Sequence, residues 1–291
     1  MHEGVLNIDK PSGMTSHDVV SRIRRVSQMR RVGHAGTLDP LATGVLLLCV
    51  GRATRLLEYV TGQRKVYEAV VRLGQATDTY DADGDIVAER PFAHITPAQI
   101  NAALVPFRGT IQQRPPIYSA IKKDGKRSYE LARQGIAVDI PLREVTIYEL
   151  TWLKWTAPDM TIRVASSAGT YIRSIAHDLG EALGCGGHLT ALRRIAIGDF
   201  SETTAVSLND LTTDNWLDWL QPADVAVAHL PQLILNPEEA QAISQGKRVD
   251  SQPGQPEAAL VRAYNQDTGF IGMVVRNDQQ WQAKKILYPT P

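Results

Sequence analysis

One stretch constrains this chain more than any other: residues 31–44, which read Arg-Val-Gly-His-Ala-Gly-Thr-Leu-Asp-Pro-Leu-Ala-Thr-Gly. Its glycines adopt backbone angles that other residues avoid, and they let a ligand approach the main chain closely. Pro40 pushes Asp39 into an extended conformation, and the apolar run 45–50 that follows predicts a buried strand. Asp39, with His34 nearby, therefore lies on a stiffened loop as a catalytic carboxylate would. From these residues alone, a simple turn around the Asp-Pro pair is an equally good interpretation.

The length and composition of the chain predict a soluble globular protein of about two domains. The 291 residues are 43% hydrophobic and 21% charged, which are ordinary values for a folded protein. The N-terminus has no signal-peptide pattern, and the longest apolar run is too short to span a membrane. Cys49 and Cys185 lack the spacing of a metal site or a disulfide framework. We interpret Cys49 as core packing and Cys185 as a loop thiol, and we expect a cytoplasmic protein.

Charge is distributed unevenly along the chain, although the formal net charge is zero. Lys and Arg outnumber Asp and Glu by ten to five in residues 1–66 and by eight to five in 91–150, whereas acid dominates in 67–90 and 201–250. Segregated charge of this kind can present a basic face to phosphate groups. Scattered, solvated charge is the alternative interpretation.

Hydrophobic periodicity and capping residues predict a succession of helices and strands. The predicted strands are a short one that begins near residue 4, then 45–50, 65–73, 144–155, 160–166, 186–198, 259–264, 270–276 and 280–287. The predicted helices are 15–29, 52–61, 96–105, 169–184 and 237–245, with a further short helix ending at Gly135. The acidic, irregular stretch 208–230 predicts a junction between two domains, which we place at 1–228 and 229–291.

Two of the predicted loops carry concentrated charge. The acidic loop 75–84 resembles a calcium loop only loosely, because the closing Glu is missing, and we predict no metal site there. The basic loop 114–129 contains Tyr118 and Tyr129, a combination that suits phosphate contacts and base stacking with RNA. A mobile, solvated loop is an equally good interpretation of this second segment.

Five motifs follow one another along the chain: Lys-Pro-Ser-Gly-Met-Thr-Ser at 10–16, Gly-His-Ala-Gly-Thr-Leu-Asp-Pro-Leu-Ala-Thr-Gly at 33–44, Lys-Val-Tyr-Glu-Ala at 65–69, Gly-Thr-Tyr-Ile-Arg at 169–173 and Leu-Arg-Arg at 192–194. With these motifs in this order, the chain resembles the bacterial TruB family of tRNA pseudouridine synthases from about residue 4 to 200. The last fifty or so residues resemble, more weakly, the PUA-like RNA-binding domain of that family. Because extended tails are lacking, we expect the stand-alone bacterial type rather than a relative that works with guide RNAs.

The resemblance implies an α+β fold: a mixed, largely antiparallel sheet flanked by helices with a central cleft, followed by a small C-terminal β-rich PUA-like domain. It also implies conversion of a uridine in the TΨC loop of tRNA (position 55 in tRNA) to pseudouridine. In that reaction the N1–C1′ glycosidic bond breaks, uracil turns over in place and C5 bonds to C1′. The C-terminal domain would grip the acceptor side of the tRNA, although residues 251–291 hold only four Lys or Arg against three acids.

The resemblance also assigns roles to single residues. Asp39 matches the catalytic carboxylate, which acts on the electron-poor sugar carbon, and Arg173 matches the arginine that keeps this carboxylate ionised. Whether Asp39 adds to C1′, adds to the base or removes the C2′ proton stays open. Tyr67 matches the active-site tyrosine, a stacking surface for the base and a candidate acceptor of the C5 proton. Tyr171 and Leu192 match positions that line the uracil pocket.

Two further residues belong to the expected substrate-binding side of the site. His34 matches a residue that fills the space left when the nucleotide flips out, and flipping is required because stacking shields the glycosidic bond. Lys10 is expected to support the Asp39 loop or to contact a phosphate. Since the reaction has no redox or group-transfer step, we expect no cofactor and no metal. The expected partner is the T arm of tRNA, bound by a monomer with no membrane or protein partner.

Two other functions would use the same features. A non-catalytic RNA-binding or RNA-folding protein would present the same basic surfaces and tyrosines. A hydrolytic glycosidase or nucleosidase would also use a carboxylate such as Asp39, but such enzymes usually employ a second carboxylate. No other carboxylate of this sequence lies in a comparably rigid motif.

Overall fold

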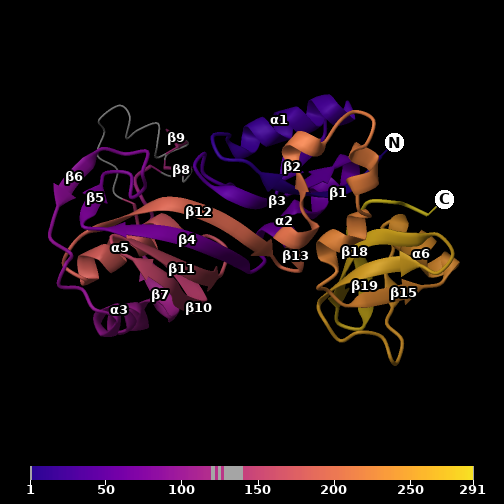
Figure 1. Cartoon of the computed structure of the whole chain (residues 1–291). Helices are drawn as coiled ribbons and strands as arrows, with labels where there is room; N and C mark the ends of the chain where they lie inside the picture. Colours follow the sequence, from indigo (N-terminus) through magenta and orange to yellow (C-terminus); the bar gives the residue numbers. More distant parts are fainter. Residues whose placement is uncertain (1, 119–121, 124–125, 128–139, 291) are drawn as a thin grey trace.

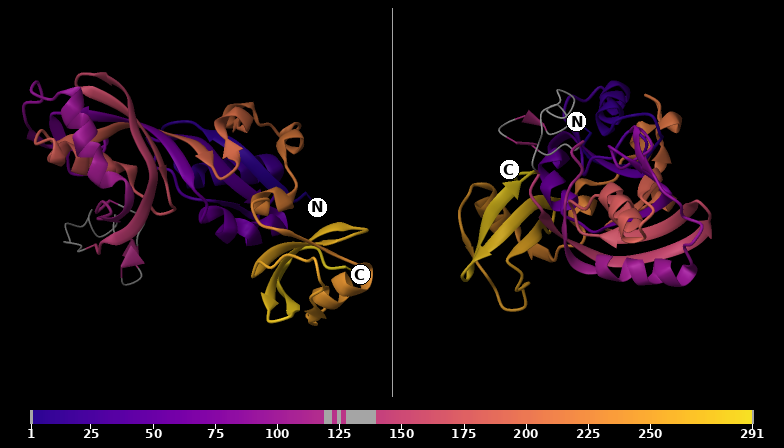
Figure 2. Two further views of the ribbon diagram at one scale, coloured as in Figure 1. Left: turned by 90° about the horizontal axis from the view of Figure 1, so that it is seen from below. Right: turned by 90° about the vertical axis from the view of Figure 1, so that its left-hand side faces the viewer.

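The computed structural model describes all residues except 1, 119–121, 124–125, 128–139 and 291. A large sheet forms most of an elongated molecule, and a smaller sheet lies at the end that carries the C-terminus (Figures 1 and 2). Tyr129 and the short helix predicted to end at Gly135 fall outside the described residues. None of the described helices is long and apolar enough to cross a membrane.

The large sheet is mixed, with the strand order β14-β1-β3-β12-β4-β11-β10-β7, and β2 and β13 extend it by pairing with β3 and β12. The β1–β14 and β3–β12 pairs run parallel, and the other pairs are antiparallel. Its strands are β1 (Gly4–Lys10), β2 (Val32–His34), β3 (Thr43–Val50), β4 (Lys65–Leu73), β7 (Gly109–Gln113), β10 (Arg143–Thr156), β11 (Asp159–Ser166), β12 (Gly187–Ile197), β13 (Phe200–Ser201) and β14 (Val206–Ser207). This sheet confirms the predicted α+β fold.

Two short ribbons lie outside this sheet. β5 (Gln75–Thr77) pairs with β6 (Ile86–Glu89), and β8 (Lys122–Lys123) pairs with β9 (Lys126–Arg127).

Strands β3 and β4 illustrate how burial determines the sequence pattern. β3 is covered on both faces: Leu46 and Leu48 belong to one hydrophobic core, whereas Leu47 and Cys49 belong to another. A strand buried on both faces is apolar at every position, which explains the unbroken apolar run. β4 instead alternates strictly between buried and half-buried residues, because only one of its faces meets the core.

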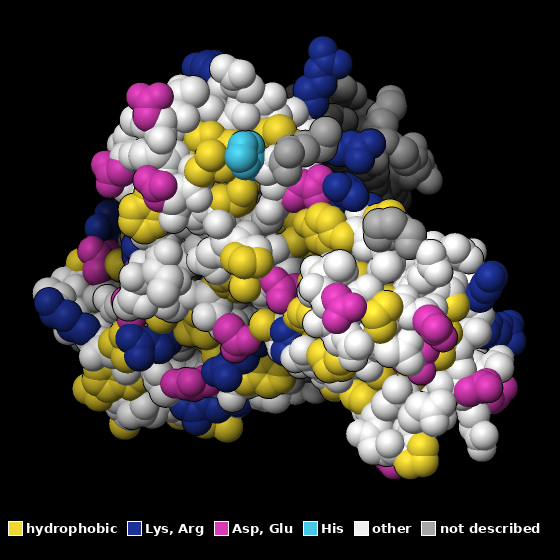
Figure 3. All heavy atoms as spheres, turned by 90° about the vertical axis from the view of Figure 1, so that its right-hand side faces the viewer, with side chains coloured by type: hydrophobic (Ala, Val, Ile, Leu, Met, Phe, Trp, Pro, Cys, Tyr) yellow, Lys and Arg dark blue, Asp and Glu magenta, His cyan; other side chains and the backbone are white. Residues whose placement is uncertain are grey.

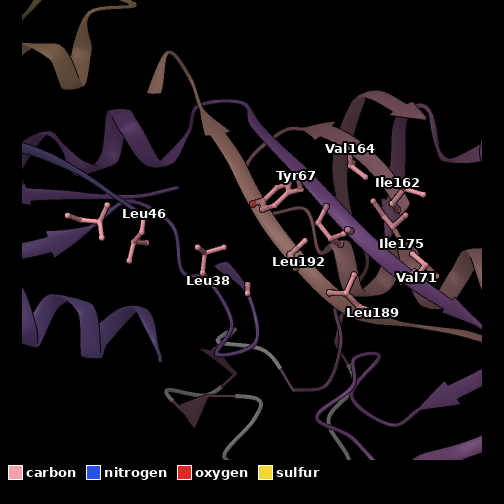
Figure 4. Close-up of a cluster of buried hydrophobic side chains, with 14 of the residues drawn as sticks. Leu38, Leu46, Tyr67, Val71, Ile162, Val164, Ile175, Leu189 and Leu192 are labelled. Atoms are coloured by element: carbon pink, nitrogen blue, oxygen red, sulfur yellow. The ribbon is translucent and has the colours of Figure 1, made fainter. Parts of the chain in front are cut away.

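Three helices complete the larger core. α1 (Ser16–Ser27) begins with a capping box formed by Thr15, and it buries Val19, Val20 and Ile23. α5 (Ile172–Ala182) packs on β12, and α3 (Pro97–Leu104) packs against α5. The side chains that these helices bury meet those of β4, β11 and β12 in one cluster (Figure 4).

The C-terminal sheet has the order β15-β17-β18-β19-β16 and its own core around the buried Trp281. Its elements are β15 (Gln232–Leu235), α6 (Pro237–Ser244), β16 (Val249–Asp250), β17 (Leu260–Asn265), β18 (Gly269–Asn277) and β19 (Gln280–Ile286). Met273 and Leu287 of this unit join the second core of the large sheet. The Arg52 guanidinium also donates to the Leu287 carbonyl at 2.8 Å, so the two sheets are in direct contact.

Most predicted elements are confirmed, and the differences have local causes. The helix predicted over 52–61 is a 3₁₀ helix over Gly51–Leu56, and only α2 (Leu57–Thr61) is α-helical. The helix predicted from residue 169 begins at Ile172, because Gly169 has a φ of +86°. Cys185 lies in a loop, as predicted, but its thiol is fully buried.

Candidate active site

Asp39 lies in the loop between β2 and β3, and the segment after β1 holds this loop on both sides of the carboxylate. The Leu38 amide donates to Ser16 Oγ at 2.8 Å, and the Gly13 amide donates to the Pro40 carbonyl at 2.8 Å. These bonds fix the residues immediately before and after Asp39. The motif at residues 10–16 therefore adds to the rigidity of the Asp39 loop that its glycines and Pro40 predict.

Lys10 reinforces the same loop from inside. Its side chain is completely buried at the end of β1, and the ammonium donates to the carbonyls of Pro11, Met14 and Pro40 at 2.9, 2.6 and 3.3 Å. Burial lowers the pKa of Lys10 to about 8, although the negative charge of Asp39 opposes this shift. This placement favours support of the Asp39 loop over contact with a phosphate.

Arg173 and Asp39 form an ion pair through both carboxylate oxygens. Arg173 Nε lies 3.0 Å from Asp39 Oδ2, and Nη2 donates to Oδ1 at 3.2 Å. The Arg173 side chain is 7% exposed, whereas that of Asp39 is 34% exposed. The guanidinium is thus enclosed by protein, while the carboxylate keeps an open side toward solvent. An arginine held in this way is a permanently charged partner for the Asp39 carboxylate.

A second carboxylate, Asp81, holds Arg173 from the opposite side. Arg173 Nη1 donates to Asp81 Oδ2 at 3.2 Å, and the Asp81 side chain is only 5% exposed. The other oxygen, Oδ1, accepts hydrogen bonds from Thr79 Oγ1 at 2.6 Å and from the Asp83 amide at 3.1 Å. Arg173 also donates to the backbone carbonyls of Thr79 and Tyr118. The bonds to Asp81, Thr79 and Tyr118 fix the orientation of the guanidinium, and the bonds to Oδ1 hold Asp81 in place.

The turn that carries Asp81 is itself held by a ring stack. Tyr80 has a φ of +66°, an uncommon backbone conformation for a residue with a side chain. Its ring stacks on His177 of α5 with centroids 3.8 Å apart and planes 12° apart. The Leu189 amide of β12 donates to the Tyr80 carbonyl at 3.0 Å. The stack therefore couples the Asp81 turn to the helix that also carries Arg173.

Burial raises the pKa of the Asp39 carboxyl above its ordinary value. The positive charge of Arg173 opposes this shift, and that of Lys10 acts in the same sense as Arg173. The negative charges of Asp81 and Asp83 add to the increase. Since burial and the two acids prevail, the ionised form of Asp39 depends on the guanidinium beside it.

Tyr67 and Leu192 lie side by side on the neighbouring strands β4 and β12, close to Leu38 of the Asp39 loop (Figure 4). Both side chains are 7% exposed. Tyr171 immediately precedes α5, and its backbone amide and carbonyl are both hydrogen-bonded to the side chain of the buried Gln113 of β7, at 2.8 and 2.9 Å. The residues predicted to line the uracil pocket thus come from three parts of the fold: β4, β12 and the residue before α5.

His34 is the last residue of β2, the strand that precedes the Asp39 loop and pairs with β3. Burial lowers the pKa of the His34 imidazole, and the charges of Arg194 and His17 act in the same direction. His34 is therefore neutral at physiological pH. Its Nδ1 is buried without a hydrogen-bond partner among the described residues.

Sequence reasoning missed Asp81, Tyr80, His177 and Gln113. The acidic turn contains several aspartates with similar neighbours, and nothing in their spacing indicates which one turns inward. The only usable signal is chemical: an arginine buried beside a carboxylate needs a second acceptor for its remaining N–H groups. Among the described residues, no group of three or more His, Cys, Asp or Glu side chains is placed to hold a metal ion.

Three family models match the chain. The model described as "TruB family pseudouridylate synthase (N terminal domain)" matches residues 24–172. The model for the "tRNA pseudouridylate synthase B C-terminal domain" matches residues 173–240, and the model "Pseudouridine synthase II TruB, C-terminal" matches residues 231–281. Together they extend from the first helix into the last strand of the C-terminal sheet.

Similar proteins agree with these matches. The chain is 42% identical to a tRNA pseudouridine synthase B of Dehalococcoides mccartyi over 99% of this chain and 98% of that protein. It is 44% identical to a tRNA pseudouridine synthase B of Solibacter usitatus over 94% and 96% of the two chains. A chain in the crystal structure of a Cbf5-Nop10-Gar1 complex has a TM-score of 0.75 and 28% identity, covering 99% of this chain and 85% of that one.

The mixed sheet thus has the fold of a pseudouridine synthase. Within that class, the chain belongs to the TruB family of pseudouridylate synthases.

Proposed function

We propose that this protein converts a uridine in the T loop of tRNA to pseudouridine. The proposal depends above all on one observation: a rigidly held, partly open Asp39 carboxylate is paired with the enclosed guanidinium of Arg173 in a chain of the TruB family. The curated relatives at 42% and 44% identity are named tRNA pseudouridine synthases B. This relationship favours an enzyme over a non-catalytic tRNA-binding or tRNA-folding protein.

The chemistry assigns a role to each part of the site. The N1–C1′ bond of the flipped nucleotide breaks, uracil turns over, and C5 bonds to C1′. The C5 proton leaves and N1 takes up a proton, so that the product is an isomer of the substrate. The Asp39 carboxylate meets the ribose, where positive charge develops at C1′, and Arg173 maintains its ionised form. Tyr67, Leu192 and Tyr171 would enclose the uracil ring. No electrons or groups leave the substrate, so the reaction requires neither a metal ion nor a cofactor.

An arginine-rich groove offers a binding surface for the RNA backbone. The exposed side chains of Arg24, Arg30, Arg31 and Arg55 line a groove of about 570 Å³ beside β2, the strand that leads into the Asp39 loop. The side of the molecule on the right of Figure 1, where the C-terminal sheet lies, carries both basic and acidic side chains (Figure 3). We therefore expect the groove to contact phosphates of the T arm when the target uridine occupies the site.

Removing one charge from the groove provides a prediction. Arg31→Gln should weaken tRNA binding and reduce the slope of log Kd against log salt by about one. Each phosphate contact releases condensed counterions on binding, and the variant makes one contact fewer. Fluorescence anisotropy with labelled tRNA at several salt concentrations measures this slope. Arg90→Gln is the matched control, because Arg90 is also an exposed arginine but pairs with Glu181 outside the groove. Equal slopes for wild type and Arg31→Gln would refute the groove as a phosphate site.

The raised pKa of Asp39 predicts the acid side of the pH profile. The active form is ionised, so tritium release under single-turnover conditions should fall as the pH is lowered, with a midpoint above the ordinary aspartate value of about 3.9. Asp81→Asn removes a negative charge that raises this pKa, so its midpoint should move to lower pH. A wild-type rate that stays constant down to pH 4 would contradict this assignment.

The experiment that tests the function is incubation with a tRNA transcript tritiated at uracil C5. Release of tritium, together with mapping of pseudouridine to the T loop, is the expected result. Absence of pseudouridine in any tRNA transcript would support the RNA-binding alternative instead. Free uracil in the mixture would indicate a hydrolytic enzyme.

We further propose that residues 1–228 form the catalytic domain and residues 229–291 a PUA-like RNA-binding domain. Both members of the Asp39–Arg173 pair come from one chain, which supports action as a monomer, and we place the enzyme in the cytoplasm with its tRNA substrate. Analytical ultracentrifugation of the free enzyme and of its tRNA complex tests the oligomeric state.

A further inference from the structure

Arg194 of β12 is a buried cation to which neither the sequence motifs nor the proposed chemistry gives a role. Its side chain is 1% exposed. Within the described part of the chain, no carboxylate lies at ion-pair distance from its guanidinium. The titratable groups that lie near it include Lys10, Lys65 and His34, whose proton affinities it reduces. Burying a cation without a counterion is costly, so the compensation must come from neutral acceptors.

These acceptors are backbone carbonyl groups at the two ends of the Asp39 loop. Arg194 Nε donates to the Val45 carbonyl at 2.7 Å, and Nη2 donates to the Gly36 carbonyl at 3.0 Å. Val45 and Gly36 lie on either side of Asp39, at the two ends of its loop. Arg194 also lies opposite Tyr67 of the neighbouring strand β4, and the guanidinium interacts electrostatically with the Tyr67 side chain. One side chain therefore holds both ends of the Asp39 loop from a position opposite Tyr67.

The register of the sheet explains why Arg194 lies between the Asp39 loop and the strand that carries Tyr67. β12 lies between β3 and β4, and residue 194 is opposite Gly44 on one side and opposite Tyr67 on the other. Gly44 has a φ of +97°, and a Cβ placed there would lie 2.3 Å from the Arg194 carbonyl oxygen. The glycine that ends the Asp39 loop thus allows the close approach of β12 to β3.

We propose that Arg194 is a positioning residue that fixes the Tyr67 hydroxyl group relative to the Asp39 loop. The inference deepens the proposed function and rests on it. The planar guanidinium reaches acceptors at both ends of the Asp39 loop in fixed directions while it faces Tyr67, which a lysine ammonium cannot reproduce. The alternative is that Arg194 merely stabilises the fold, as any buried, hydrogen-bonded side chain does.

A double-mutant cycle separates these two roles. Arg194→Lys should lower the single-turnover rate roughly 10- to 100-fold, as misplacement of a reacting group does, with little change in KM. In the Tyr67→Phe background, where the hydroxyl group is absent, the same replacement should cost less than about threefold. Arg193→Lys is the matched control, since Arg193 lies next to it on β12 but pairs with Asp9 and Glu202. An equal loss of rate in both backgrounds would overturn the proposal.

A second measurement needs neither enzymatic activity nor a change at Arg194. In enzyme labelled with ¹⁵N-arginine, the side-chain N–H groups of Arg194 should exchange with solvent at least about tenfold faster in Tyr67→Phe than in wild type, because the proposed interaction with the hydroxyl group is removed. The exchange rate of the Arg193 side chain should not change. Unchanged exchange at Arg194 would refute its link to Tyr67. Because this assay does not depend on tRNA, it distinguishes failure of this inference from failure of the proposed function.

Discussion

Replacement of Asp39 by Asn should abolish the isomerisation of uridine while leaving tRNA binding nearly intact. The amide has the same shape but cannot act as a carboxylate at the sugar carbon, so we expect the single-turnover rate to fall by about 10⁴-fold or more. The Kd for tRNA should change by less than about threefold, because the side chain carries none of the phosphate contacts. Tritium release and fluorescence anisotropy measure the two quantities on the same preparation.

Asp83→Asn provides the matched control for this prediction. Asp83 is an exposed aspartate in the turn that carries Asp81, and only its backbone amide takes part in the hydrogen bonds around Arg173. This variant should retain a rate close to that of wild type. Substantial tritium release by Asp39→Asn, or an equal loss of rate in both variants, would remove Asp39 from the reaction.

Replacement of Arg173 by Met should have a double effect, on the reaction and on the fold. It leaves Asp81 buried without a cation, and a buried carboxylate that loses its partner destabilises a protein by about 3–5 kcal/mol. It also removes the charge that opposes protonation of Asp39, so the rate at neutral pH should fall by at least about 10²-fold. Urea denaturation measures the free energy of unfolding, and tritium release measures the rate.

The double variant Arg173→Met with Asp81→Asn tests the cause of the destabilisation. When the buried carboxylate is also neutralised, most of the lost stability should return, while the reaction should stay impaired. If the double variant is no more stable than Arg173→Met alone, the burial of Asp81 does not explain the loss. Recovery of the reaction rate in the double variant would show that Arg173 is dispensable for catalysis.

The strand that follows Asp39 and the strand that carries Tyr67 could be predicted, because the pattern of apolar residues in each is typical of only one kind of burial. The apolar run of β3 and the alternation in β4 each follow from burial alone. The helix over 52–61 could not be predicted in the same way. Its first turns are a 3₁₀ helix that begins at Gly51, where φ is +66°, and the Arg52 side chain in these turns is bound to Glu3 and to Leu287, which is distant in sequence.

The surroundings of Arg173 could not be predicted for a different reason. Its second carboxylate lies 92 residues earlier in the chain, in a turn whose aspartates all have similar neighbours. The stack of Tyr80 on His177 likewise joins residues that no periodicity connects. Such contacts depend on how β12 and α5 are placed in three dimensions, and the residue pattern of a single segment does not predict that placement.

The most direct measurement is a crystal structure of the enzyme with a T-arm RNA that carries 5-fluorouridine at the target position. Fluorine at C5 cannot leave as a proton, so the reaction should stop with the base in the site. We expect an everted nucleotide with its ribose in contact with an Asp39 carboxylate oxygen, and with Arg173 still paired to that carboxylate. A nucleotide that remains stacked in the RNA, or one bound with its ribose out of reach of Asp39, would contradict this account.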